Sequence, residues 1–425
     1  MNRIIYNVQG LYLSPYFGEQ GENNNEGNYF LSGFNILKKI EKIQNINYTI
    51  NSKRINQIVS KNLLYRGFDY PTVDLDFSYI PDGVTNEYRL NFDVGHFKHN
   101  EIYPMFSSMA KSNLYDKKDF FLVIKKNEED LFEYSDPTPE SINPNTKNDI
   151  LDLNSNNYGL LHFQDCYLSQ YDFRININDL PIVNQKYTCN NIIFYNSGSN
   201  LSNKVLDLRS GLLNIQNEEI IIPKQLNPKS PDIFGVNILL PDQLQIQILS
   251  NNEKILFDTE TIYSFDYNVE FNRSELRSAN YKFPLLNKIK FPIEGTVNLG
   301  ILEKNISTGS FFEYLNLNND YNIICNFTTN KIGVNNTRYI FSGCKFNSIN
   351  YNSALGDNKN ILVSFKFDID PDFYSRGLFA SGNLINIQYD GFLMGSSGGY
   401  EYELMGTEAG IDYDLAWTTI APLIY

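Results

Sequence analysis

Histidine and tryptophan are scarce in this chain, with three histidines and one tryptophan among 425 residues. Histidine supplies many general bases and zinc ligands near neutral pH, so few candidates exist for either role. His96 and His99 form an H-x-x-H pair and His162 stands apart, and we interpret all three as structural or solvated. The G-x-S-x-G match at Gly395–Gly399 has no later histidine and is interpreted as a glycine turn. With no Walker loop either, the sequence predicts no enzyme, no metal and no cofactor.

Basic residues are also fewer than acidic ones. Lysine and arginine total 35 against 49 acidic residues, which gives a formal net charge of −14 and a pI near 4.8. Proteins bind nucleic acid largely through basic side chains that release counterions from phosphates. This composition therefore argues against ordinary nucleic-acid binding.

Long apolar runs and paired cysteine motifs are absent. No run approaches the roughly 18 apolar residues of a membrane helix, and the first ten residues have no signal-peptide core. We expect a soluble protein made in the cytosol, without membrane contact. The four cysteines, Cys166, Cys189, Cys325 and Cys344, show no C-x-x-C spacing, and we expect buried free thiols.

The sequence contains an internal repeat, seen as two pairs of similar segments. FQDCYLSQYDF (Phe163–Phe173) matches FSGCKFNSINY (Phe341–Tyr351) at a shift of 341 − 163 = 178. INYTINSKR (Ile46–Arg54) matches FDYNVEFNR (Phe265–Arg273) in the same order. Because two pairs recur in one order, we interpret them as an internal duplication. The residues that define the repeat are Tyr48, Arg54, Phe163, Cys166, Tyr267, Arg273, Phe341 and Cys344.

Apolar and polar residues alternate along many segments, as in half-buried strands. In PTVDLDFSY (Pro71–Tyr79), the alternation turns Asp74 and Asp76 away from the core. These two carboxylates line either a solvated face or a deliberately acidic surface. Residues 84–100 are expected to continue the β pattern. Residues 34–43 predict either a short helix or the approach to a strand.

The fold class predicted is mainly β, with two tandem β-sandwich or tube-type domains, long loops and a C-terminal extension. We expect an N-terminal arm over 1–32 and a first domain over 33–228. A second, repeated domain would cover 229–371, and the C-terminal extension 372–425. A proline-rich stretch at 221–232 favours the boundary between the halves, and residues 128–157 are expected to form a long loop.

The order of these motifs resembles the tail tube, or major tail, proteins of tailed bacteriophages. The resemblance rests on GLYLSP (Gly10–Pro15), PTVDLDFSY, NEYRLNF (Asn86–Phe92) and the repeated strands described above. It implies a β-sandwich that assembles into rings, with a sheet lining a lumen through which DNA is ejected. The loop over 128–157 and the extension after Pro371 depart from this pattern and would suit a tail tip or collar.

A duplicated chain would supply two of six ring positions, so we expect a homotrimer with pseudo-sixfold symmetry and stacked rings. The resemblance implies a virion tail protein assembled in the host cytoplasm, with other tail proteins as partners. DNA would pass without specific binding along a lumen carrying Asp74 and Asp76. Alternatives are a collar, baseplate or capsid-decoration protein and, ranked lower, a glycan-processing enzyme or carbohydrate-binding protein.

Overall fold

In the computed structural model, the described part of the chain is built almost entirely of antiparallel strands, which confirms the prediction of a mainly β fold. Two short helices are described, α1 (Thr85–Arg89) and α2 (Ser108–Lys111). The described residues are 9–13, 35–36, 38–40, 42–51, 54–57, 65–68, 72–81, 83–96, 101–111, 116–125, 158–176, 179–195, 220–221, 239, 243–250, 253–255, 262–276, 286–302, 319–327, 336–352 and 360–382.

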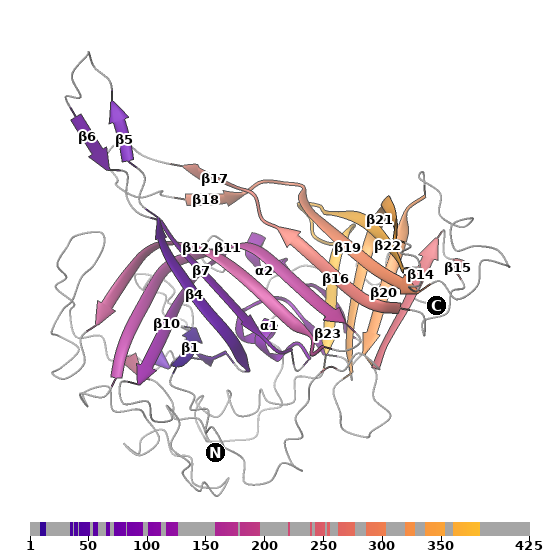
Figure 1. Cartoon of the computed structure of the whole chain (residues 1–425), viewed down its shortest axis with the longest axis horizontal. Helices are drawn as coiled ribbons and strands as arrows, with labels where there is room; N and C mark the ends of the chain where they lie inside the picture. Colours follow the sequence, from indigo (N-terminus) through magenta and orange to yellow (C-terminus); the bar gives the residue numbers. More distant parts are fainter. Residues whose placement is uncertain are drawn as a thin grey trace, which may run out of the picture.

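An eight-stranded antiparallel sheet runs across the molecule and consists of two blocks of four strands (Figure 1). In spatial order the strands are β4 (Ile43–Asn51), β7 (Thr72–Tyr79), β12 (Ile182–Tyr195), β11 (Tyr158–Asn176), β16 (Ile262–Glu270), β19 (Ile293–Leu302), β22 (Asn360–Ile369) and β21 (Thr337–Asn352). The blocks meet where β11 pairs with β16. We call this pairing the junction.

Each block has a second group of strands. In the first block, β10 (Lys117–Lys125) pairs with the beginning of β11 and with β1 (Gln9–Leu13), which also pairs with β3 (Lys38–Lys39). The second block adds β14 (Leu244–Ser250), β15 (Glu253–Ile255), β20 (Tyr321–Phe327) and β23 (Gly377–Gly382), together with the beginning of β21. Two short strands of the first half, β8 (Gly95–His96) and β9 (Tyr103–Pro104), pair with β23. β11 and β21 are long enough to join both groups.

The two blocks carry β-bulges at equivalent positions. The β11–β12 ladder shifts register between Leu168 and Gln170, and the β21–β22 ladder shifts between Phe346 and Ser348. Both differences equal the motif shift, since 346 − 168 = 178 and 348 − 170 = 178. The bulges give the two blocks the same bend at the same residue.

The strands β4 and β16 repeat each other in the same way. The bulge between Ile43 and Asn45 corresponds to the bulge between Ile262 and Ser264, because 262 − 43 and 264 − 45 both equal 219. The same shift places Arg54 opposite Arg273 in the sequence match, since 273 − 54 = 219. β16 is thus the second-block equivalent of β4.

One pair of neighbours shows how different side chains fill equivalent space. In the first block Cys189 pairs with Val73, and at the equivalent register of the second block Phe367 pairs with Gly295. A Cβ atom on Gly295 would lie 2.3 Å from Phe367 Cζ, so the large ring requires the glycine. The side-chain volume is exchanged across the ladder while the strand pairing is retained.

Two hairpins project from the same side of the sheet (Figure 1). The first is formed by β5 (Arg54–Gln57) and β6 (Tyr65–Phe68), and the second by β17 (Arg273–Leu276) and β18 (Leu286–Ile289). Each begins at the repeated arginine that follows β4 or β16. A small parallel pair joins β2 (Asn35–Ile36) to β13 (Ile220–Ile221).

Local structure corrects one sequence expectation and decides between two alternatives in another. Residues 84–100 do not simply continue the β pattern, because α1 occupies Thr85–Arg89. There Glu87, which is 1% exposed, accepts hydrogen bonds from Tyr79 Oη at 2.7 Å and Tyr171 Oη at 2.9 Å. The turn of helix delivers this acceptor to buried hydroxyls that would otherwise lack one. Of the two readings for residues 34–43, the described part contains strands: β2, β3 and the start of β4.

The expectation of four free thiols is wrong for one pair. Cys166 and Cys189 face each other across the β11–β12 ladder and form a disulfide, whereas Cys325 and Cys344 are free and buried. The equivalent of Cys189 is Phe367, since 189 + 178 = 367, so Cys344 has no cysteine in the cross-strand position. The loop predicted over 128–157 and the turn at Gly395–Gly399 lie outside the described residues.

Candidate assembly surfaces

The face of the eight-stranded sheet that points away from the core carries mostly polar side chains on every strand. In β7 the alternation is strict: Val73, Leu75 and Phe77 are buried, and the residues between them are half-exposed. Residues directly opposite on neighbouring strands share a face, so the ladder pairings extend this polar surface from β4 to β21. We call it the polar face. Its charged members are Asp74, Asp76, Asp172, Asp266, Glu270, Glu294, Asp368, Arg174, Lys186, Lys345 and Lys366.

The polar face is acidic on balance, with seven carboxylates against four basic side chains, 4 − 7 = −3. Asp74 and Asp76 lie on it, in the orientation that the alternation predicts. Asp74 accepts hydrogen bonds from Asn51 Nδ2 at 2.6 Å and from Thr188 Oγ1 at 3.4 Å. An open depression on the face is lined by Asp76 together with Asn45, Asn47, Gln170, Asp172 and Lys186. Whether this face lines a lumen stays a prediction.

Three carboxylates of the polar face hold their protons more tightly than an exposed aspartate does. Partial burial raises the pKa of Asp76, against the opposing charge of Lys186 and with the support of nearby Asp74. Partial burial also raises the pKa of Asp172 and of Asp266, although each accepts an amide hydrogen bond that lowers it. Loss of solvent therefore disfavours the charged form of all three, and neighbouring carboxylates add to the effect at Asp76 and Asp172.

The junction is lined by aromatic side chains on the core face. Tyr171 and Phe173 of β11 meet Phe265 and Tyr267 of β16, and all four are at most 1% exposed. The Phe173 and Tyr267 rings stack with centroids 5.2 Å apart, and Tyr171 stacks on Tyr267 at 5.9 Å. Burial of these rings, together with the β11–β16 ladder, joins the two blocks.

Arg273 fixes the end of the junction. Its two terminal nitrogens contact the Asp116 carboxylate at 2.5 and 2.7 Å, in the bidentate geometry that guanidinium favours. Its Nε donates to the Leu168 carbonyl at 3.0 Å, next to the β11 bulge, and the guanidinium lies 5.2 Å from the Tyr167 ring centre. Arg273, which follows β16, therefore bonds both to Asp116, next to the start of β10, and to the backbone at the β11 bulge.

A buried lysine lies beside this ion pair. Lys118 is 3% exposed, and its Nζ lies 5.1 Å from the centre of the Phe92 ring. Burial lowers the pKa of Lys118 to about 8, against the attraction of Asp116 and with the support of Arg273. The motif comparison identified Arg273 but could not identify Asp116 or Lys118, because neither belongs to a repeated sequence pattern.

The two outermost strands of the eight-stranded sheet are β4 and β21. They expose side chains whose equivalents are buried at the junction. Tyr48 and Ile50 of β4 are 40% and 41% exposed, whereas their equivalents in β16, Tyr267 and Val269, are 1% and 0% exposed. At the other end, Phe346 and Ile349 of β21 are only partly buried, whereas their equivalents Leu168 and Tyr171 are fully buried. Among the described strands, β4 and the Phe346–Asn352 part of β21 each have a ladder partner on one side. We call these the open edges.

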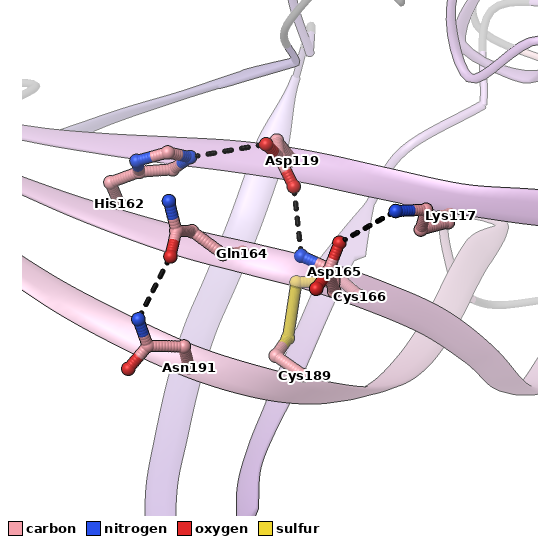
Figure 2. A network of polar contacts seen from close by, with 8 residues as sticks. All are labelled: Lys117, Asp119, His162, Gln164, Asp165, Cys166, Cys189 and Asn191. Carbon is pink, nitrogen blue, oxygen red and sulfur yellow. Dashed lines mark hydrogen bonds and ion pairs between the residues drawn. A yellow bond between two sulfur atoms is a disulfide. The ribbon is translucent and has the colours of Figure 1, made fainter. Parts of the chain in front are cut away.

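Figure 2 shows a second polar network, where β10, β11 and β12 lie side by side. Asp119 accepts from the backbone N–H of Asp165 at 2.8 Å and lies 3.4 Å from His162 Nε2. Burial alone would raise the pKa of Asp119, but the hydrogen bond and charge of His162 lower it. Lys117 pairs with Asp165 at 3.1 Å. These contacts join adjacent strands, and His162 takes part in them through Asp119.

The other sequence-predicted residues are placed as follows. Phe163, Cys166, Phe341 and Cys344 are all fully buried, at the same depth in the two blocks. His99 lies outside the described residues. Within the described ranges, no group of histidine, cysteine and acidic residues is arranged to hold a metal ion. No helix in the described part of the chain is long and apolar enough to cross a membrane.

No protein-family model matches the sequence, and no curated protein matches it. Solved structures similar to part of the chain include one from the anti-feeding prophage baseplate, with 11% identity and a TM-score of 0.22, covering 29% of this chain and 87% of that chain. Another is from the PVC sheath-tube complex of an extracellular contractile injection system in the extended state, with 14% identity and a TM-score of 0.23, covering 33% and 94%. A third is from the PVC sheath/tube terminator in the extended state, with 16% identity and a TM-score of 0.21, covering 29% and 88%. The likeness is a distant one, to chains of prophage and contractile injection-system particles.

Proposed function

We propose that this protein is a structural, non-enzymatic component of a phage-type tail, in which copies of the chain assemble into stacked rings that form a tube. The observation that carries the proposal is the junction. One chain already contains two equivalent blocks joined edge to edge, and among its described strands the equivalent edges at both ends of the sheet have no ladder partner.

The open edges favour a head-to-tail assembly. Joining the β21 edge of one chain to the β4 edge of another would repeat the junction between molecules. A contact of this heterologous kind closes into a ring when the rotation per copy divides a full turn, and otherwise gives a helical filament. With two blocks per chain, three chains supply six equivalent positions. Six is the number of tube domains in the ring that the sequence resemblance led us to expect.

The polar face is the surface that we assign to the lumen. It is continuous over eight strands, and its seven carboxylates exceed its basic residues. A wall of this kind repels phosphates and offers a passing DNA few basic groups to bind. Asp74 and Asp76 would then act by like-charge repulsion, so that DNA slides through without being held.

Electron microscopy of the purified chain across a concentration series tests this proposal. We expect rings with threefold or pseudo-sixfold averages, stacking into hollow cylinders as the concentration rises. A map with Asp74 and Asp76 on the outer wall would refute the lumen assignment. Bounded complexes that never elongate would instead favour a collar or baseplate protein, and a strictly monomeric chain at every concentration would overturn the ring itself.

The lumen charge has its own test. We expect the double variant Asp74→Lys, Asp76→Lys to form rings and to bind short double-stranded DNA in a salt-dependent manner, whereas the parent rings do not bind it. A charge reversal on the β17–β18 hairpin, Glu275→Lys, leaves the charge of the polar face unchanged and serves as the control, compared with Asp74→Lys alone. DNA binding by the parent rings at physiological salt would contradict the proposal.

A further inference from the structure

The junction specifies how two chains would meet, residue by residue. Within the chain, Tyr171 pairs with Val269 and Phe173 pairs with Tyr267. Adding 178 to the β11 residues and subtracting 219 from the β16 residues converts these pairs into Ile349 with Ile50 and Tyr351 with Tyr48. The same conversion pairs Asn350 with Thr49. Both strands of this derived ladder are open edges, and the apolar residues exposed on β4 are those whose equivalents the junction covers.

Arg273 has an equivalent at the same place in the first repeat. Arg54 begins β5 just after β4, as Arg273 begins β17 just after β16. Arg273 bonds to the Leu168 carbonyl at the β11 bulge, and the equivalent bulge of β21 lies at Phe346. The partner strands β10 and β20 also match, because the bulges at Lys118/Phe120 and Tyr321/Ile323 both differ by 203.

The shift of 203 between β10 and β20 also locates the equivalent of Asp116, the carboxylate that accepts from Arg273. Asp116 plus 203 gives Asn319, which is followed by Asp320. Asn319 Nδ2 donates to Ser250 Oγ at 3.1 Å, which leaves its carbonyl oxygen as the group suited to accept from a guanidinium. Asp320 lies 3.6 Å from Lys345 Nζ and 3.5 Å from Arg376, with its side chain 48% exposed.

We propose that Arg54 locks one chain to the next: it enters the β21 bulge of a second copy and donates to the Phe346 carbonyl and the Asn319 side chain, beside Asp320. This inference rests on the proposed ring assembly and names the contact that holds the ring. The partner is therefore a second copy of this chain, docked through β4 on β21 in the register given above.

The lock between chains is built to be weaker than the one within the chain. A neutral amide, Asn319, replaces the carboxylate of Asp116, and Lys345 replaces the aromatic ring of Tyr167. A guanidinium bonds more strongly to a carboxylate than to an amide, and Lys345 adds a like charge. The chain therefore separates from its neighbour under conditions that leave its own two blocks joined.

Arginine variants test the lock through the concentration at half-assembly. We expect Arg54→Ala to raise it at least tenfold and Arg54→Lys to recover only part, because lysine lacks the bidentate fork. Arg66→Ala removes the same charge from the same hairpin and should change the value less than twofold. The thermal midpoint of the unassembled chain should be the same for all three variants.

A gain-of-function variant makes the test sharper. Asn319→Asp restores the carboxylate found at Asp116, so it should lower the half-assembly concentration, and this gain should vanish when Arg54 is alanine. If rings still form and the half-assembly concentration is unchanged by both Arg54→Ala and Asn319→Asp, the Arg54 contact is overturned. The ring proposal would still stand. Enhancement by Asn319→Asp that persists without Arg54 would also overturn it.

Cysteine cross-linking tests the register independently. Chains carrying Asn350→Cys, mixed with chains carrying Thr49→Cys, should form a disulfide-linked dimer on a non-reducing gel, because directly opposite residues have the separation that a disulfide needs. Asn350→Cys mixed with Asn47→Cys or Asn51→Cys, two positions out of register on the same face, should link several-fold less. Preferential linkage of an out-of-register pair overturns the register. Absence of any linkage, with no rings formed, overturns both proposals.

Discussion

Arg273 and Asp116 form a bidentate ion pair across 157 positions of sequence, with side chains only 10% and 6% exposed. The pair ties Arg273, which begins β17 just after β16, to Asp116, which directly precedes β10 of the first block. It makes the relative position of the two blocks a property of the chain itself, before any assembly takes place.

Breaking this ion pair should destabilise the whole chain. We expect Arg273→Ala to lower the free energy of unfolding by about 3–5 kcal/mol, because it leaves the Asp116 carboxylate buried and unpaired. Denaturant titration below the assembly concentration measures it. Lys117→Ala, which removes the more exposed partner of Asp165, is the control and should change the value by less than about 1 kcal/mol. Equal effects for the two variants would show that burial of the Arg273 pair has no special weight.

The exchange of volume between Gly295 and Phe367 predicts a non-additive pair. Gly295→Val should destabilise the chain by about 1–3 kcal/mol, because its side chain overlaps the Phe367 ring. Phe367→Ala should lower stability by about 3–5 kcal/mol through the cavity it leaves. The double variant resembles the Val73 position of the first block, so it should be more stable than the sum of the single changes predicts. Strict additivity, measured by a double-mutant cycle, would contradict the equivalence of these positions.

The disulfide predicts a definite thiol count. Alkylation of the denatured, unreduced chain should modify two cysteines, Cys325 and Cys344, and reduction should raise the number to four. Reduction should also lower the free energy of unfolding by about 2–4 kcal/mol, because the 23-residue separation closed by Cys166–Cys189 restricts the unfolded chain. Four reactive thiols before reduction would show that the pair is open.

The raised pKa of Asp76 on the polar face predicts that the stability of the chain depends on pH. Its folded-state pKa is raised above the usual 3.8, so the folded state binds the proton more tightly, and stability from this group falls as the pH rises through the raised pKa. Asp76→Asn should therefore be more stable than the parent at neutral pH, by less than about 1 kcal/mol because solvent screens a half-exposed group. The difference should disappear below pH 3.8.

Asp74→Asn is the comparator on the same strand. It should reduce stability at neutral pH, because the Asp74 carboxylate accepts from Asn51 and Thr188. Denaturant titrations of both variants at several pH values give the measurement. A gain for Asp76→Asn that is equal at pH 3 and pH 7 would rule out titration of Asp76 as its cause.

The sequence by itself determined the strands and the repeat, because both are local. Period-two alternation places Asp74 and Asp76 on the face opposite Leu75, whatever the strand pairs with. The shift of 178 between Phe163 and Phe341 is visible in the residues alone. The turn of helix at Thr85–Arg89 was missed, since its reason is a distant pair of tyrosine hydroxyls that need Glu87 as acceptor.

Only the tertiary structure decided which edges meet. The partner of Arg273 is an aspartate 157 positions away with no sequence signal of its own, and the Cys166–Cys189 disulfide depends on the register of the β11–β12 ladder. The exposed Tyr48 and the buried Tyr267 occupy equivalent places in the equivalent strands β4 and β16. They differ because β16 pairs with a strand on both sides, whereas β4 is an open edge. Strand pairing and burial are set by contacts between residues far apart in the chain, which local sequence patterns cannot encode.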